Sequence, residues 1–220
     1  MLTMTVQPRF NQKFSTLFIS FILFTASIFS LSASANQVDL SSTITLDIFS
    51  QPLSFNIPQS WKQTREDQLA DMYSAEFIPN NEGMSQWSEL ICIQGFRNVS
   101  DDLSSEMFLE SLASTYKEHC KGEVVYEPLG DVEINGYQGS HGLLGCTRMP
   151  NSHTVNIGHQ QQFVSTPQGE MGYYTALIAD AQVILLHKSM RGKVFSPNLP
   201  PLTKDNYSSF IHTLFPQNKP

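Results

Sequence analysis

The feature of the sequence that most constrains its fold is a change in the spacing of apolar residues. As far as Phe96, apolar and polar residues alternate in short segments, which predicts strands. From Leu103 to Cys120 the apolar residues recur at helical spacing, and alternating segments then resume as far as Ser189. Short turns join the expected strands into hairpins, and hairpins predict an antiparallel sheet. The expected fold is therefore α+β, a mainly antiparallel sheet flanked by an internal helix and a C-terminal helix.

The expected elements can be placed by residue number. Strands are expected at 41–49, 53–57, 72–78, 87–96, 123–128, 131–134, 137–146, 153–166, 171–179 and 182–189. Helices are expected at 103–120, with Ser104 or Ser105 as its N-cap, and at 203–215. Turns are expected at Gln51-Pro52, at Asn135-Gly136, at 167–170 and at Asp180-Ala181.

The first 35 residues have the three zones of a secretory signal peptide. Arg9 and Lys13 are their only charges, an apolar run follows at 14–31, and a small-x-small cleavage site ends at Ala35. Cleavage there leaves residues 36–220 as a single α+β domain, long enough to bury one core. The alternative is a retained membrane anchor, since the run approaches the roughly 20 residues that span a bilayer. The serines in the run and the adjacent cleavage site favour the signal peptide.

The charge of the chain restricts its partners. The whole chain carries a net charge of −7, and loss of the two basic residues of the signal leaves 11 basic against 20 acidic residues, a net −9. Such a surface repels phosphate backbones, so nucleic acid is not an expected partner, and binding to anionic membranes is disfavoured. A neutral or cationic protein, peptide or small ligand fits better. The signal peptide adds the export machinery, and no stable membrane insertion is expected.

Three cysteines remain in the expected mature chain. Cys92 lies within an apolar segment typical of a buried strand, where a thiol is an inert small hydrophobe. Cys120 ends the expected internal helix and Cys146 ends a strand, so these two can meet more readily. A Cys120–Cys146 disulfide is therefore predicted for an oxidising compartment. Three reduced thiols remain the alternative.

Several short motifs give the chain a family resemblance. They are an Ile-Pro-x-x-Trp unit ending at Trp61, an Asn-Gly-Tyr turn ending at Tyr137, a late Gly-Tyr-Tyr strand ending at Tyr174, and the closing helix. Together with the internal helix, this arrangement resembles the PsbP/Mog1-like fold over most of 41–215. The family contains photosystem subunits, a Ran-binding factor and many exported bacterial proteins, which act mainly by binding proteins. The signal peptide and the cysteines favour the exported bacterial branch. The chain also resembles small type II secretion substrates of Gram-negative bacteria.

The spacing of histidines and serines argues against metal binding and against nucleophilic catalysis. His153 and His159 lie six residues apart, about 20 Å along an extended strand, so they cannot bind one metal ion unless the segment bends. Ser140 and His141 are adjacent in an expected strand, so their side chains point to opposite faces and cannot share a proton. No metal ligand and no nucleophile is assigned on this basis.

Paired carboxylates are a further candidate for catalysis. Glu66, Asp67 and Asp71 are expected in a loop or turn, and the acidic pair at Asp101 and Asp102 suits the start of a helix. The sequence has no glycine-rich phosphate loop and no dinucleotide fingerprint. No catalytic residue and no cofactor is therefore assigned.

Aromatic and amide side chains suggest a ligand surface. Trp87 enters a strand from a polar loop, Gln160 begins a run of glutamines typical of an exposed edge, and Tyr174 follows Tyr173 so that each face of the sheet carries one ring. A surface of this kind suits a neutral ligand or a peptide. The alternative is that Trp87 and one of the tyrosines belong to the core.

The functional hypothesis is an exported, non-catalytic binding module of a Gram-negative bacterium. Two alternatives remain open at this point. One is an extracellular hydrolase whose site is assembled from distant residues, and the other is a structural subunit of a periplasmic complex. A cleft with convergent titratable groups would favour the hydrolase, and a large exposed apolar patch would favour the subunit.

Overall fold

The computed structural model describes residues 40–157 and 160–215. The expected signal peptide and its cleavage site lie outside these residues. The strands are β1 (Ser41–Ile48), β2 (Gln51–Pro58), β3 (Trp61–Gln68), β4 (Met72–Pro79), β5 (Glu89–Arg97), β6 (Val124–Ile134), β7 (Tyr137–Met149), β8 (Ser152–Ile157), β9 (Gln160–Ser165), β10 (Gln168–Ala179) and β11 (Gln182–Gly192). The helices are α1 (Ser105–His119) and α2 (Tyr207–Ile211).

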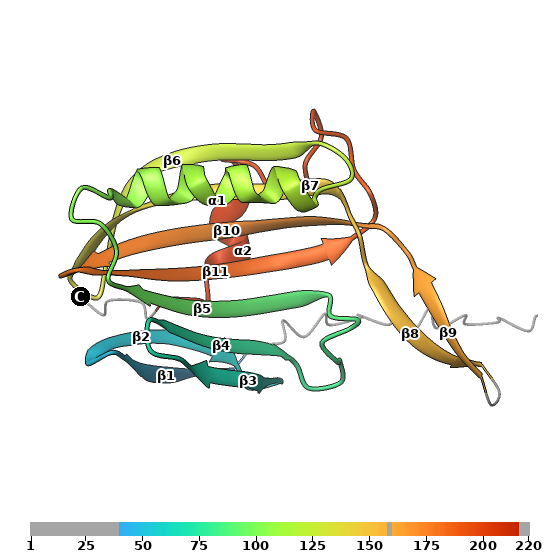
Figure 1. Cartoon of the computed structure of the whole chain (residues 1–220), viewed down its shortest axis with the longest axis horizontal. Helices are drawn as coiled ribbons and strands as arrows, with labels where there is room; N and C mark the ends of the chain where they lie inside the picture. The colour runs from blue at the N-terminus through green and yellow to red at the C-terminus, as the bar shows by residue number, and fades with distance from the viewer. Residues whose placement is uncertain (1–39, 158–159, 216–220) are drawn as a thin grey trace, which may run out of the picture. The chain divides into compact units, whose positions relative to one another are not determined.

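Seven of the strands form one sheet in the order β3-β4-β5-β11-β10-β7-β6 (Figure 1). Every neighbouring pair in it is antiparallel. The predicted α+β class, with a mainly antiparallel sheet and two helices, is confirmed. The Asn135-Gly136 turn that joins β6 to β7 and the Asp180-Ala181 turn that joins β10 to β11 are where the sequence predicts them.

Helix α1 covers one face of the sheet, where it packs on β7, β10 and β6. Its N-cap is Ser104, whose hydroxyl accepts a hydrogen bond of 3.1 Å from the Met107 amide. Leu109 and Ala113 are buried in a cluster with Leu144 and other residues of the sheet. The predicted internal helix is thus confirmed, because its apolar stripe and its capping residue agree.

The opposite face is covered by the β1–β2 hairpin and by α2 (Figure 1). Helix α2 is shorter than the expected 203–215. The Asn206 side chain accepts a hydrogen bond of 2.8 Å from the Thr203 amide, and this holds the preceding residues in a turn rather than a helix. Leu214 lies beyond the helix but is still buried, and its carbonyl accepts a bond of 2.7 Å from the Asn56 amide. Neither helix in the described part of the chain is long and apolar enough to cross a bilayer.

Strand β3 was not predicted, and Glu66 and Asp67 lie within it rather than in a loop. The strand is an edge of the sheet and most of its side chains are exposed, so it lacks the alternation that marks a half-buried strand. The first hairpin turn was also misplaced. It lies at Phe49 and Ser50, both with positive φ, and the expected Gln51-Pro52 turn is the start of β2.

The segment expected as one strand at 153–166 is a hairpin of β8 and β9 that projects from the sheet (Figure 1). His153 lies in β8, and His159 lies outside the described residues. The prediction of a turn at 167–170 is also wrong for residues 168–170, which belong to a strand. Strand β10 already begins at Gln168, with an irregular register before Glu170.

The predicted Cys120–Cys146 disulfide is present, with the two Cα atoms 5.6 Å apart. It joins the residue after α1 to strand β7. Cys92 is the free cysteine and is buried in β5, as expected for a mid-strand position.

Candidate functional site

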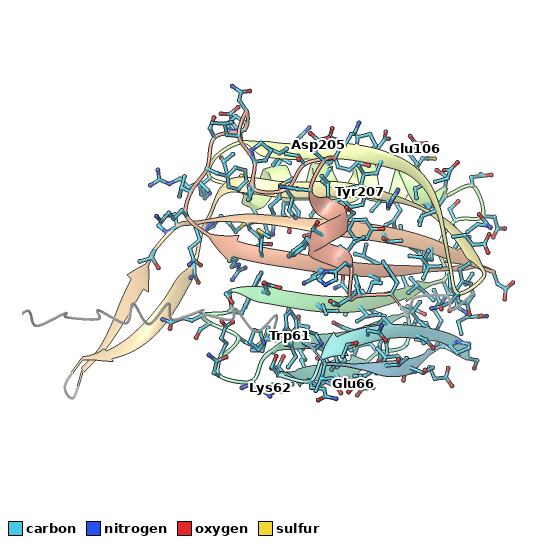
Figure 2. All side chains as sticks on the ribbon, turned by 180° about the vertical axis from the view of Figure 1, so that it is seen from behind. Trp61, Lys62, Glu66, Glu106, Asp205 and Tyr207 are labelled. Atoms are coloured by element: carbon cyan, nitrogen blue, oxygen red, sulfur yellow. A yellow bond between two sulfur atoms is a disulfide. The ribbon has the colours of Figure 1, made fainter. Side chains whose placement is uncertain are left out.

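A cavity of about 300 Å³ opens between α2 and strand β6. This volume is at the lower end of the range for small-molecule sites. In the view of Figure 2, α2 with Tyr207 stands in front of the sheet. The residues that line the cavity, called here the aromatic pocket, are Val132, Glu133, Ile134, Asn135, His141, Tyr173, Tyr207, Ile211 and Phe215.

Four rings form the walls of the aromatic pocket. Tyr173 and Tyr207 are stacked, with ring centroids 5.8 Å apart and planes 2° from parallel. His141 meets both of them edge to face, at 5.5 Å and 6.1 Å. Phe215 adds an edge-to-face contact with Tyr173 at 6.4 Å. Rings in these arrangements support one another, so the pocket has preformed apolar walls.

Two of the polar side chains in the pocket, His141 and Tyr173, are paired with each other. The Tyr173 hydroxyl lies 2.8 Å from His141 Nδ1. Burial lowers the pKa of His141, although a hydrogen bond to the Leu129 carbonyl opposes this shift. Burial also raises the pKa of Tyr173 to about 12, so near pH 7 both groups are uncharged.

The strand period explains why His141 faces this pocket. Ser140, the preceding residue in β7, points to the α1 side, where its hydroxyl lies 2.8 Å from that of Ser105. The sequence-based expectation that Ser140 and His141 face opposite sides is therefore confirmed, and they do not form a nucleophile–base pair. His141 pairs instead with Tyr173 from the neighbouring strand β10.

The ligand surface predicted from Trp87, Gln160 and Tyr174 does not form as expected. Trp87 is 5% exposed and Tyr174 is 2% exposed, so both belong to the core. The physical reason differs for the two residues: Tyr174 lies under α1, and Trp87 packs on Leu90 and Cys92 of β5. The Arg191 guanidinium also lies over the Trp87 ring, 3.9 Å from its centroid. Gln160 lies in β9, and its side chain is outside the described part of the structure.

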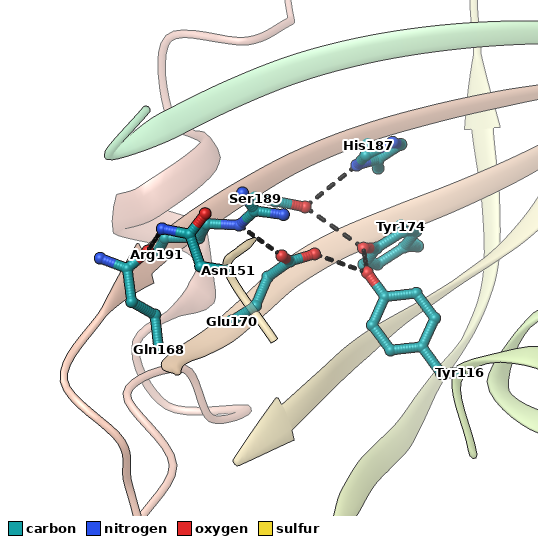
Figure 3. Close-up of polar contacts among 8 residues, drawn as sticks. All are labelled: Tyr116, Asn151, Gln168, Glu170, Tyr174, His187, Ser189 and Arg191. Atoms are coloured by element: carbon teal, nitrogen blue, oxygen red, sulfur yellow. Dashed lines mark hydrogen bonds and ion pairs between the residues drawn. The ribbon is translucent and has the colours of Figure 1, made fainter. Parts of the chain in front are cut away.

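Tyr174 belongs to a buried polar network on the α1 side of the sheet (Figure 3). Its charged end is Glu170, which accepts hydrogen bonds from Arg191 Nε at 2.6 Å and from the Tyr116 hydroxyl at 2.8 Å. The Tyr116 and Tyr174 hydroxyls are 2.6 Å apart. Burial raises the pKa of both tyrosines, so Glu170 and Arg191 carry the charges of the network as an ion pair.

The other end of the network is neutral. Ser189 Oγ lies 3.2 Å from the Tyr174 hydroxyl and 3.0 Å from His187 Nδ1. The His187 ring stacks on Tyr174 with centroids 4.6 Å apart, and burial lowers its pKa to about 4. This chain of hydrogen bonds connects β10, β11 and α1, and its charged groups, Glu170 and the partly exposed Arg191, are paired with each other. Glu170 was missed because it was expected in a turn.

Cys92 and His187 lie opposite each other in β5 and β11. Burial is the main cause that raises the pKa of the Cys92 thiol to about 12, with a smaller contribution from the nearby Glu76 carboxylate. A catalytic cysteine needs the opposite shift, toward the thiolate. The pair is therefore a core contact.

Three of the five carboxylates considered as candidates, Glu66, Asp67 and Asp71, have structural partners. Glu66 accepts a hydrogen bond of 3.1 Å from the Tyr73 hydroxyl, and Asp67 pairs with Arg65. Asp71 accepts a bond of 2.5 Å from the Asn98 side chain. Within 40–157 and 160–215, no group of three or more His, Cys, Asp or Glu side chains is arranged to hold a metal ion.

Solved structures similar to this chain include two proteins from different organisms. The Ran-binding protein Mog1p of Saccharomyces cerevisiae has 11% sequence identity and a TM-score of 0.39, over 80% of this chain and 86% of that one. Cyanobacterial PsbP (CyanoP) of Synechocystis sp. PCC 6803 has 8% identity and a TM-score of 0.38, over 82% and 91%. Both represent the PsbP/Mog1-like fold that the sequence resembles. No family model and no curated protein matches the chain. At these identities and TM-scores, no residue, ligand or partner is transferred to this chain.

Proposed function

We propose that this protein is an exported binding module whose aromatic pocket receives an apolar group of its partner. The observation that carries the proposal is the preformed set of rings from His141, Tyr173, Tyr207 and Phe215. Apolar walls with a few polar atoms are typical of binding sites. Because the polar atoms of His141 and Tyr173 already bond to each other, the aromatic walls offer apolar contact area, and Glu133 is the charged residue of the lining.

The place of action in this proposal is outside the cytoplasm of a Gram-negative bacterium, with type II secretion as the route beyond the periplasm. The Cys120–Cys146 disulfide supports an oxidising compartment. The proposed mature protein is the single domain at 36–220. N-terminal sequencing of the exported protein tests this part, with Asn36 as the expected first residue. Recovery of the uncleaved chain from membranes would contradict it.

Indole is a suitable probe for the pocket, because it is a small aromatic molecule without charge. Titration of ¹⁵N-labelled protein with indole should shift the amide resonances of residues around the pocket in a saturable way. The variant Ile211→Trp, which fills the pocket from α2, should lose these shifts. Leu69→Trp is the matched control, since Leu69 is 62% exposed in another part of the molecule. Absence of saturable shifts in the wild type, or equal shifts in Ile211→Trp, would overturn the proposal.

A further inference from the structure

The aromatic pocket lies along an edge of the main sheet. Strand β6 is the last strand in the order of the seven-stranded sheet, and among the described strands it pairs only with β7. Four consecutive β6 and turn residues, Val132 to Asn135, line the pocket. The site therefore combines an apolar cavity with the backbone of an edge strand.

The hairpin turn fixes which backbone groups of β6 are free. Asn135 and Gly136 both have positive φ, at 54° and 82°, so they form a two-residue turn and Ile134 faces Tyr137. In such a hairpin the pair that flanks the turn exchanges both hydrogen bonds, and the pairs then alternate along the ladder. The amides and carbonyls of Ile134 and Val132 thus point to β7.

The residues between them have the opposite orientation. The backbone polar groups of Glu133 and Asp131 point away from the sheet, and no backbone hydrogen bond to another described segment occupies them. Asp131 and Glu133 are exposed. A regular stretch of four strand residues, Asp131–Ile134, about 13 Å long, is thus available for pairing with another strand. It lies between the turn and the irregular register at Pro128–Gly130.

The two faces of this edge differ in chemistry. The side chains of Val132 and Ile134 pack toward the core on the pocket side. Glu133 lies on the α1 side, where its carboxylate accepts a hydrogen bond of 2.6 Å from Gln138. Asp131 and Glu106 of α1 line a hollow of about 60 Å³ on that same side. The edge is therefore apolar and aromatic on one side and acidic on the other.

We propose that the ligand of the aromatic pocket is an extended peptide segment that adds to β6 as an antiparallel strand over Asp131–Ile134. This inference rests on the proposed function. The peptide residue opposite Val132 points into the pocket and is apolar. Its neighbours, opposite Asp131 and Glu133, point to the acidic side and are Lys or Arg. Backbone bonds to an edge strand with a pocket for alternate side chains are a known mode of peptide recognition.

The charge of the protein supports this pattern. A net charge of −7 for the chain, together with the carboxylates beside β6, attracts a basic peptide and repels an acidic one. The opposite edge, β3, is less suited to this role. It carries alternating charges on both faces, and the Arg65–Asp67 ion pair lies along it. Charged edges of that kind discourage strand addition.

Four synthetic peptides test the strand pairing without any change to the protein. The probe is acetyl-Gly-Lys-Phe-Lys-Gly-amide, with affinity measured by calorimetry. N-methylation of both lysines removes the N–H groups that face β6, and should weaken binding by about tenfold or more. N-methylation of the phenylalanine removes an N–H that faces away, and should change affinity by less than about threefold. A peptide with glutamates in place of the lysines should not bind.

Two variants of the protein test the same contact from the other side. Glu133→Pro removes an outward N–H, which an edge strand tolerates because no ladder bond is lost. Glu133→Gln removes the same charge and keeps the N–H. The proline variant should lose peptide binding, and the glutamine variant should weaken it only a few-fold at low salt. Melting curves establish that both variants are folded, and if the proline variant is not, the methylated peptides decide.

The outcomes separate this inference from the proposed function. If indole binds the pocket but the peptide does not bind, or the methylated peptides bind equally, the strand pairing is wrong and the pocket proposal stands. If neither indole nor the peptide binds, both are wrong. If the wild type self-associates at micromolar concentration and Glu133→Pro abolishes this while the peptide does not bind, the occupant of β6 is a second copy of the chain and the peptide inference is overturned.

Discussion

The half-buried His187 should make the stability of this protein fall steeply in mild acid. In the native state the half-buried ring stacks on Tyr174 and bonds to Ser189 through Nδ1 at 3.0 Å. Burial lowers its pKa to about 4. In the unfolded chain the ring is solvated and has the ordinary pKa of about 6.5.

The sign and size of the effect follow from this difference. Between pH 6.5 and pH 4 the unfolded chain binds a proton that the native protein does not, so acid favours unfolding. One pKa unit is a tenfold difference in proton affinity and corresponds to about 1.4 kcal/mol. The native pKa of about 4 lies more than two units below the unfolded value of about 6.5. His187 should therefore lower the free energy of unfolding by about 3 kcal/mol at pH 4. Above pH 7 it should contribute no pH dependence.

Urea unfolding between pH 4 and pH 7.5 measures this effect when the wild type is compared with His187→Gln. Glutamine retains a side-chain amide for Ser189 but does not titrate in this range. Acids elsewhere in the protein are common to both proteins, so the difference between the two curves isolates His187. The matched control is His119→Gln, at an exposed position near the end of α1. Its curve should follow that of the wild type.

Parallel curves for the wild type and His187→Gln would refute the reasoning. A direct measurement covers the case in which the variant is too unstable to analyse. In an NMR titration of the folded wild type, the His187 ring resonance should stay unchanged down to about pH 5. A ring that titrates near pH 6.5 would show that His187 reaches solvent in the native state.

Three further predictions concern the core. The double variant Cys120→Ser/Cys146→Ser should lose about 3.5 kcal/mol of unfolding free energy by the chain-entropy model, and an unchanged urea midpoint would contradict this. Trp87→Ala should cost about 3 to 5 kcal/mol, because the ring is buried, and a melting temperature close to that of the wild type would show that Trp87 is exposed. Cys92, whose pKa burial raises to about 12, should react with iodoacetamide only after unfolding, as followed by mass spectrometry. Rapid alkylation of the folded protein would place the thiol at the surface.

The sequence was most informative where one local signal sufficed. Helix α1 was predictable because its apolar stripe and the Ser104 cap lie within one segment. The Asn135-Gly136 hairpin turn was predictable because these residues adopt positive φ easily. The turn at Phe49 and Ser50 was not, since neither residue type favours positive φ and the conformation depends on the packing of the β1–β2 hairpin.

The candidate site was not predictable from local patterns, because its rings come from β7, β10 and the C-terminal segment. His141, Tyr173, Tyr207 and Phe215 meet only after the sheet has formed. The Tyr173-Tyr174 pair did indicate one ring on each face. Which of the two tyrosine rings points into a cavity depends on the elements that pack on each side of the sheet. These elements are distant in the sequence, so no local pattern predicts the answer. The choice of Tyr174 was wrong for that reason.

The elements that cover the two faces of the sheet explain why Tyr173 lines the aromatic pocket whereas Tyr174 is buried under α1. Helix α1 has 15 residues and runs along β7 and β10, whereas α2 has 5, about 7.5 Å of helix. The β1–β2 hairpin covers much of the remaining α2 side, and it reaches the β6–β7 turn through a bond of 2.7 Å from the Asn135 side chain to the Ser54 carbonyl. Neither this hairpin nor the short α2 extends along the whole apolar side of β6, and the aromatic pocket lies in the space between them. An apolar cavity beside an unpaired strand edge is a surface that an added peptide strand would cover on both counts, through the pocket and through the backbone.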